Sequence, residues 1–177
     1  ERLVEEDANV LLFDVRGNPD SATTKYIQTG EVMGFHLRYL TKMRRPWYRV
    51  ENRTPAPLLF GVFSRDGFKV IRNRSGALNL TCFHGFYPNL FGKPYLDHLF
   101  LYLRSAAARK ILSQSMRRYG DGLEKFEPND LNDALAPSAT WFDSLPINLI
   151  QSAMEAASKG EHLPFEIEQR FASLISY

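Results

Sequence analysis

The spacing of the hydrophobic residues changes at Pro94, and this change constrains the fold more than any other feature of the 177-residue chain. Between residues 47 and 87, short runs of β-branched and aromatic residues alternate with turn-forming residues, a pattern typical of strands. The four runs are residues 47–52, 58–64, 68–73 and 78–86. Ser64-Arg65-Asp66-Gly67 lies between two of these runs and predicts a hairpin loop.

Beyond Pro94 the hydrophobic residues recur at spacings of three and four, as on one face of an α-helix. This face comprises Leu96, Leu99, Phe100, Leu103, Ala107, Ile111 and Leu112. We expect the helix to end near residues 119–122, and a second helix to begin near Glu127, with Asn129 or Asp130 as its cap.

After Trp141 the sequence predicts two more helices, separated by Lys159-Gly160 and Pro164. The predicted fold class is therefore α+β, with a mostly antiparallel β-sheet core followed by C-terminal helices.

The N-terminal region predicts a short strand over Asn9–Val15 and a short helix. Ser21 is the expected cap of this helix, and Gly30 or Gly34 the expected end. The chain starts at Glu1 without the basic start and apolar run of a secretory signal, so we interpret it as a piece of a longer protein. No apolar run approaches the roughly 20 residues that a membrane helix needs, so no membrane partner is expected.

The net charge of +2 hides a strong segregation of charge along the chain. Residues 36–75 contain ten basic and two acidic residues, a net charge of +8, and residues 104–125 contain six and two, a net charge of +4. The two ends of the chain are acidic, at −4 for residues 1–35 and −6 for residues 126–177. Such segregation is expected of a surface that binds a polyanion. A solvated surface paired with the acidic ends explains the charges equally well.

The sequence contains no pattern of a known catalytic or cofactor site. Dinucleotide-binding, phosphate-loop, zinc-protease and nucleophile-elbow motifs are all absent. Cys82 is the single cysteine and the four histidines are scattered, so no metal site is predicted. One unpaired cysteine fits the reducing cytoplasm. We therefore predict no catalytic, cofactor-binding or metal-binding residue in this chain.

Two basic segments remain as candidate binding sites. In the first, Arg44 and Arg45 precede Pro46-Trp47-Tyr48, and arginine side chains suit phosphate groups or the edge of guanine. We expect Trp47 to anchor the start of a strand. In the second, Arg72-Asn73-Arg74-Ser75 lies at a turn, where we expect Asn73 to be mainly structural and an arginine to face solvent or DNA.

A third segment, Tyr119-Gly120-Asp121-Gly122, has glycines that permit unusual backbone angles. Such a loop can bring main-chain amides close to a phosphate. A sharp turn at the end of a helix is the interpretation that the spacing favours.

In their order along the chain, several short motifs resemble the C-terminal part of adenine-specific DNA methyltransferases from bacterial restriction–modification systems. The motifs are Tyr26-Ile27 with Gly30-Glu31, Arg45-Pro46-Trp47-Tyr48, Ile71-Arg72-Asn73 with Gly76-Ala77-Leu78, Phe83-His84-Gly85 with Tyr87-Pro88, and Tyr119–Leu123 through Lys125–Pro128. They span about residues 24–132. The family usually has glycine where this chain has Asp121. Because an acidic side chain repels phosphate, this loop ranks lowest among the candidate DNA contacts.

The resemblance implies a target-recognition domain over residues 1–137 and a C-terminal helical extension over residues 138–177. It implies that double-stranded DNA and the catalytic domain of the same parent chain are the partners. S-adenosylmethionine would be bound only by that catalytic domain, which carries an Asn-Pro-Pro-[Phe/Tyr] motif absent here and is expected to precede Glu1. This fragment should therefore be inactive as a methyltransferase.

The residues that we expect to contact DNA fall into two ranks. Arg44, Arg45, Arg72 and Arg74 come first, followed by Lys69, Asn79, Thr81 and His84. For His84, a structural role inside the domain is about as plausible as a DNA contact.

Two non-enzymatic alternatives fit the same pattern of charge. Aromatic residues interleaved with arginine and lysine are also typical of modules that bind RNA or single strands. A basic face can equally meet an acidic protein partner. Nuclease activity is not expected, because Glu124-Lys125 lacks the acidic strand that would accompany it.

Overall fold

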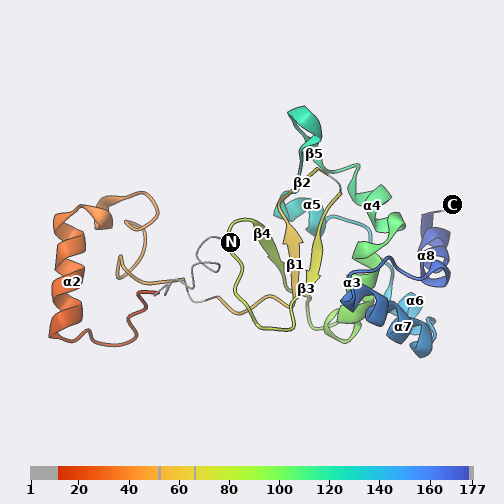
Figure 1. The fold of residues 1–177 in the computed structure, drawn as a ribbon, viewed down its shortest axis with the longest axis horizontal. Helices are drawn as coiled ribbons and strands as arrows, with labels where there is room; N and C mark the ends of the chain where they lie inside the picture. The colour runs from red at the N-terminus through yellow and green to blue at the C-terminus, as the bar shows by residue number, and fades with distance from the viewer. Residues whose placement is uncertain (1–11, 52, 66, 176–177) are drawn as a thin grey trace. The chain divides into compact units, whose positions relative to one another are not determined.

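The computed structural model describes residues 12–51, 53–65 and 67–175 (Figure 1). The chain divides into two compact units, one ending at Arg53 and one beginning at Thr54, which we call the N-terminal unit and the C-terminal unit. The fold class is α+β with antiparallel sheets, as predicted. The proposed functional boundary at residue 137 lies within the C-terminal unit and stays a prediction.

The N-terminal unit is built on α2 (Ser21–Val32). Asp20 caps this helix in place of the expected Ser21, since its carboxylate accepts a hydrogen bond of 2.7 Å from the Thr23 amide. Gly34, at φ 73°, follows the end of the helix and leads into a 3₁₀ turn, η1 (Phe35–Leu37).

Two strands predicted for this unit are not formed in its described residues. Residues 12–15 have no regular structure, and residues 9–11 of that prediction lie outside the described residues. Residues 47–51 are likewise irregular, although their aromatic and β-branched composition predicted a strand. Trp47 packs instead against α2, where a Cβ placed on Gly30 would lie 2.7 Å from its ring.

The C-terminal unit begins with an antiparallel sheet in the order β3-β1-β4. The strands are β1 (Leu58–Gly61), β3 (Val70–Arg72) and β4 (Phe83–Phe86). Phe60 lies opposite both Val70 and His84, and Leu58 lies opposite Arg72 and Phe86. Because directly opposed residues share a face, this register places Arg72 and His84 on the same side of the sheet as the buried Phe60.

A smaller sheet has the order β2-β6-β5, formed by β2 (Phe63–Ser64), β5 (Arg117–Arg118) and β6 (Glu124–Lys125). A 3₁₀ turn, η3 (Gly120–Gly122), joins β5 to β6, with Asp121 at φ 58° and Gly122 at φ 68°. The Gly-Asp-Gly segment is therefore the turn of a hairpin, and the prediction that it ends a helix is wrong.

The long helix predicted beyond Pro94 is two helices, α3 (Leu96–Arg104) and α4 (Ala106–Leu112), preceded by the 3₁₀ turn η2 (Lys93–Tyr95). The break falls at the buried Ser105, whose backbone is extended. Its hydroxyl donates to the Tyr102 carbonyl at 2.6 Å and accepts from the Ala108 amide at 3.2 Å. Ser105 thus caps α4, and hydrophobic spacing does not reveal such a cap.

The remaining helices lie in the acidic C-terminal region of the chain. They are α5 (Pro128–Asn132), α6 (Ala139–Asp143), α7 (Ile147–Ser158) and α8 (Phe165–Ala172), with a final 3₁₀ turn, η4 (Ser173–Ile175). Glu127 caps α5 in place of Asn129 or Asp130, and its amide donates to the Asp130 carboxylate at 2.7 Å. The prediction of two helices separated by Gly160 and Pro164 is confirmed by α7 and α8.

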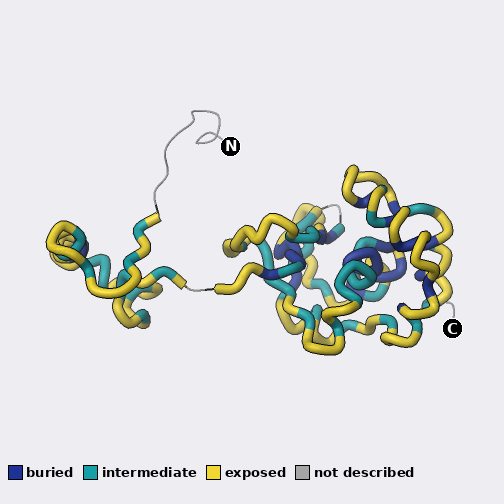
Figure 2. Tube along the Cα trace, turned by 90° about the horizontal axis from the view of Figure 1, so that it is seen from below, coloured by how far each residue is buried: buried dark blue, intermediate teal, exposed yellow. Residues whose placement is uncertain are grey.

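The hydrophobic core of the C-terminal unit lies between the larger sheet and the C-terminal helices. Helix α3 packs against β3 and α7, and α4 packs against α8. Figure 2 shows most of the buried residues inside the C-terminal unit. Phe60, Leu101, Ile167 and Phe171 are almost completely inaccessible. Among the described residues, no helix has the length and hydropathy to cross a membrane.

This packing predicts that α8 is part of the same folding unit as the sheet. Replacing Ile167, which is 0% exposed, with alanine should lower the free energy of unfolding by about 2–5 kcal/mol through lost burial and a cavity. Phe165 on the same helix is 75% exposed, so Phe165→Ala is the matched control and should change little. Urea denaturation followed by circular dichroism measures both. Similar effects of the two variants would contradict the packing.

Candidate nucleic-acid interface

A groove lined by basic side chains runs along β3 and α7 in the C-terminal unit. One hollow of about 510 Å³ is lined by Arg72, Arg74 and Lys93, together with Gln151 and Met154 of α7. A second hollow of about 410 Å³ shares Arg72 and Arg74. We call these two hollows the basic groove and define its cations as Lys69, Arg72, Arg74, Lys93 and Arg104. Asp97 is the one acidic residue among the described residues that line it.

The Arg72 side chain forms hydrogen bonds within the fold. Its Nε donates to the Asp97 carboxylate of α3 at 2.7 Å, and its Nη1 donates to the Pro57 carbonyl at 3.1 Å. The side chain is 21% exposed. Arg72 was expected to contact DNA in the first rank. The structure gives it a role in fixing the end of β3 to α3, because it lies on the core-facing side of the sheet.

Three cations of the groove have no such partner. Lys69, Arg74 and Lys93 are exposed, and within the described part of the chain none of their side chains forms a hydrogen bond or an ion pair. Lysine and arginine side chains in this state can bind phosphate without first breaking an internal contact. Lys69 and Arg74 were both predicted as DNA contacts.

Lys93 and Arg104 were not predicted as parts of the groove. Lys93 lies at the start of η2, and Arg104 ends α3, where its guanidinium donates to the carbonyls of Ala157 and Glu161 at 3.4 and 2.9 Å. Both residues come next to β3 only through the packing of α3 and α7. No spacing in the sequence signals this proximity.

The turn after β3 is held by Asn73, as expected. The Asn73 side-chain amide donates to the carbonyls of Ala56 and Ala77 at 2.8 and 2.9 Å. The Ser75 hydroxyl donates to the Asn73 side-chain oxygen at 3.1 Å. These bonds fix the loop from which Arg74 projects and confirm the structural role of Asn73.

The second-rank candidates on and before β4 lie apart from the lining of the groove. The half-buried His84 ring is 3.1 Å from the Phe126 carbonyl through Nε2, which fits the structural role considered for it. Asn79 donates through Nδ2 to the Phe83 carbonyl at 2.8 Å. Thr81 is exposed and remains a candidate contact.

The basic residues of β5 and β6 are paired with glutamates. Arg118 lies 3.6 Å from Glu124, and Lys125 lies 2.7 Å from Glu127, with Arg117 at 3.6 Å from the same carboxylate. The hydrogen bond from Lys125 lowers the pKa of the Glu127 carboxyl. Three of the six basic residues that the sequence places in residues 104–125 are therefore paired at this hairpin, and the other three lie in α3 and α4.

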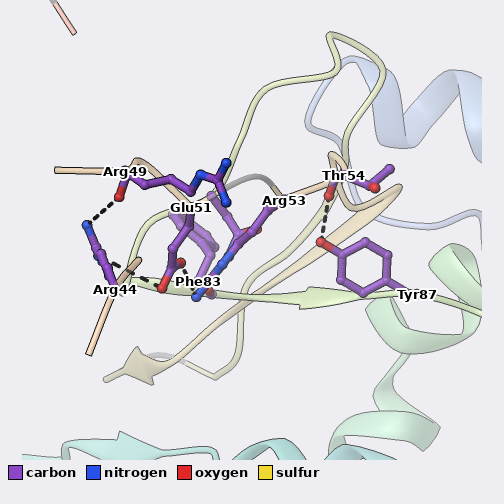
Figure 3. A network of polar contacts seen from close by, with 8 residues as sticks. Arg44, Arg49, Glu51, Arg53, Thr54, Phe83 and Tyr87 are labelled. Carbon is purple, nitrogen blue, oxygen red and sulfur yellow. Dashed lines mark hydrogen bonds and ion pairs between the residues drawn. The ribbon is translucent and has the colours of Figure 1, made fainter. Parts of the chain in front are cut away.

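The first-rank arginines of the N-terminal unit differ in their surroundings. Arg44 is half-buried and donates through Nη1 to the Arg49 carbonyl at 3.2 Å, with its Nη2 4.0 Å from Glu51 (Figure 3). Glu51 is paired more closely with Arg53, at 2.6 Å. Arg45 is exposed and donates to the carbonyls of Lys42 and Arg44 at 2.8 and 3.0 Å.

The N-terminal unit also contains a hollow of about 340 Å³ walled by aromatic rings, which we call the aromatic pocket. Its rings are Phe13, Tyr26, Phe35, Trp47 and Tyr48, and Arg44 lines it with them. The Phe13 and Tyr26 centroids are 5.0 Å apart, and those of Trp47 and Tyr48 are 5.7 Å apart. The Arg-Pro-Trp-Tyr segment is recognisable in the sequence, whereas the contribution of α2 to this pocket depends on the fold.

The histidine, cysteine and acidic side chains of the described residues are dispersed. No group of three or more histidine, cysteine, aspartate or glutamate side chains gathers there to hold a metal ion. His98 lines the larger hollow of the basic groove, and burial lowers the pKa of its imidazole against the opposing effect of Asp97. The chemistry that the groove offers is the binding of anionic groups.

Comparison with known proteins gives one family. Residues 1–163 match the family described as the C-terminal domain of the type II methyltransferase M.Eco57I. The chain is 42% identical over 137 residues to the type II methyltransferase M.AccI of Acinetobacter calcoaceticus. It is 27% identical over 115 residues to the type II methyltransferase M.XamI of Xanthomonas campestris pv. amaranthicola.

The two relatives are much longer than the segments they share with this chain. The matches cover 76% and 65% of this chain, but 25% of M.AccI and 21% of M.XamI. No solved structure matches the chain.

The contrast between Arg72 and Arg74 gives a test of the groove. Arg72→Ala should lower the free energy of unfolding by about 1–2 kcal/mol, because it removes hydrogen bonds to a carboxylate and to a carbonyl. Arg74→Ala is the matched control and should stay within about 0.5 kcal/mol of the parent chain. Both values come from urea denaturation, and equal losses would show that Arg72 does not fasten β3 to α3.

Proposed function

The chain belongs to the family of the type II methyltransferase M.Eco57I C-terminal domain, and from this premise we propose that it recognises DNA for a methyltransferase of a restriction–modification system. The proposed activity of the parent is site-specific transfer of a methyl group to N6 of adenine. Membership of the family carries the proposal, and the unpaired cations Lys69, Arg74 and Lys93 supply a surface suited to DNA.

In this proposal the work of methylation is divided between domains. The target adenine must leave the stack of bases before its amino group can react. A recognition domain holds the duplex in register through phosphate contacts and selects the site through base edges. The partners are double-stranded DNA and the catalytic domain of the same parent protein, acting in the cytoplasm where bacterial DNA lies. The short share of M.AccI and M.XamI that the chain matches supports a larger parent.

The sequence contains no Asn-Pro-Pro-[Phe/Tyr] motif of the kind that the catalytic domain of the resembled group carries. Asn18-Pro19 is the part of the chain nearest to an Asn-Pro-Pro motif, but it leads into Asp20, whose carboxylate is occupied in capping α2. We therefore assign the cofactor to the parent's catalytic domain and derive no step of methyl transfer for this chain.

The basic groove suits a phosphate backbone because its floor and its rim differ in charge. Arg72 on the floor is neutralised by Asp97, whereas the exposed Lys69, Arg74 and Lys93 keep their charge. A phosphate chain would thus meet cations along both walls of the groove, from β3 and from η2. Arg74 projects from a loop fixed by Asn73, so it is the residue best placed to read a base edge.

Salt dependence of binding tests the role of the groove. Replacing Lys69 and Lys93 together with alanine should weaken binding to duplex DNA and lower the slope of log affinity against log salt by about two, one for each lost phosphate contact. Fluorescence anisotropy with a labelled duplex at several salt concentrations measures this slope.

The exposed Arg170 on α8 provides the control, since it is a cation outside the lining of the groove. Arg170→Ala should leave the slope within error of the parent chain. An unchanged slope in the double variant would contradict the groove as the phosphate-binding surface. Stronger binding to single strands than to duplex would instead support the RNA or single-strand alternative.

The division of labour also predicts that this chain alone transfers no methyl group. The 177-residue chain, incubated with duplex DNA and radiolabelled S-adenosylmethionine, should leave the DNA unlabelled because the sequence contains no Asn-Pro-Pro-[Phe/Tyr] motif. A parent protein that includes the catalytic domain is the positive control. Labelling of DNA by the isolated chain would contradict the assignment of catalysis to another domain.

A further inference from the structure

The aromatic pocket of the N-terminal unit is not explained by the packing of a core. Ile27 and Gly30 are the buried residues among the described part of this unit. Tyr26 lines the pocket yet is 64% exposed, and Met33 at its edge is 61% exposed. The rings thus surround a hollow open to solvent, with a volume in the range of small-ligand sites.

The width of the pocket depends on Gly30 of α2. A Cβ at this position would lie 2.7 Å from the Trp47 ring and 3.7 Å from the Phe35 ring. Glycine in a helix costs stability relative to alanine, so its presence here fits a need for close approach. The Trp47 indole is also fixed by its Nε1, which donates to the Glu31 carboxylate at 3.0 Å. The ring is therefore held as a wall of the pocket.

The segment that supplies Arg44, Trp47 and Tyr48 to the pocket is strongly basic. Residues 36–53 contain Arg38, Lys42, Arg44, Arg45, Arg49 and Arg53 against the single acidic residue Glu51. Of these cations, Arg44 lines the pocket itself. An apolar pocket that bound a hydrophobic protein segment would not need this charge. A flat aromatic group carried on a polyanion matches both properties.

We propose that the aromatic pocket binds one unpaired nucleobase of a DNA duplex, stacked on the Tyr26 side of the pocket, while the surrounding arginines hold the adjoining phosphates. This inference rests on the proposed function, because it takes DNA as the ligand. Removal of an adenine from the stack for methylation leaves the opposite base without a partner, so the reaction itself supplies an unpaired base. Stacking on aromatic rings accepts any base, since every base has a π-face.

Two duplexes that differ by one nucleobase test the proposal with the 177-residue chain. In the first, a single base faces an abasic site. In the second, both strands are abasic at that position. The two duplexes therefore have the same number of phosphates and a similar flexibility. The chain should bind the first duplex about 5- to 150-fold more tightly, the range given by stacking of one base on aromatic side chains. Fluorescence anisotropy measures both affinities.

Tyrosine variants tie the preference to the pocket. Tyr26→Ala should lower the ratio of the two affinities to about one. Tyr26→Phe keeps the ring and should retain the preference for the first duplex. Tyr39→Ala is the matched control, because Tyr39 is 79% exposed in the same unit and does not line the pocket. A ratio lost equally in Tyr39→Ala, or kept in Tyr26→Ala, would overturn the proposal.

The outcomes separate this inference from the function on which it rests. If the unsubstituted 177-residue chain binds both duplexes equally, the pocket does not bind a base, and the recognition function still stands. If it binds neither duplex at low salt, the recognition function fails and the pocket proposal fails with it.

Discussion

The burial of α3 between β3 and α7 is the constraint on which the basic groove depends. Leu101 of this helix is fully inaccessible, and Asp97 at its start holds the guanidinium of Arg72. Helix α7 is in turn tied to the end of α3 by the bonds from Arg104 to the Ala157 and Glu161 carbonyls. The groove is therefore a hollow between packed elements, and its cations are positioned by the core.

The sequence predicted the parts of this arrangement that local pattern controls. Phe68 and Val70 are buried and Lys69 is exposed, because neighbouring strand residues point to opposite faces. Helices α7 and α8 lie where Gly160 and Pro164 punctuate the chain. What the sequence could not reveal depends on tertiary contact. Ser105 divides a helix that spacing alone makes continuous, and His84 turns toward the core because of its register with β1.

The two units hold their side chains by different means. The C-terminal unit buries a continuous set of hydrophobic residues, whereas the described residues of the N-terminal unit rely on contacts between rings around α2. Composition does not predict this difference, since both units are rich in aromatic residues. Trp47 was expected to anchor the start of a strand. Because Gly30 has no side chain, the Trp47 ring packs on helix α2 instead.

Some polar residues of the groove and its turn form bonds that hold the fold, and others do not. This difference affects how such a domain can diverge. Exchange of Arg72 or Asn73 disturbs bonds that hold the strand and its turn. Lys69, Arg74 and Lys93 carry no such bonds among the described residues, so they are open to exchange without cost to folding. Under the proposed function, selection can thus act on DNA preference at these positions while the scaffold stays unchanged. A fold built in this way is suited to diversify into many specificities.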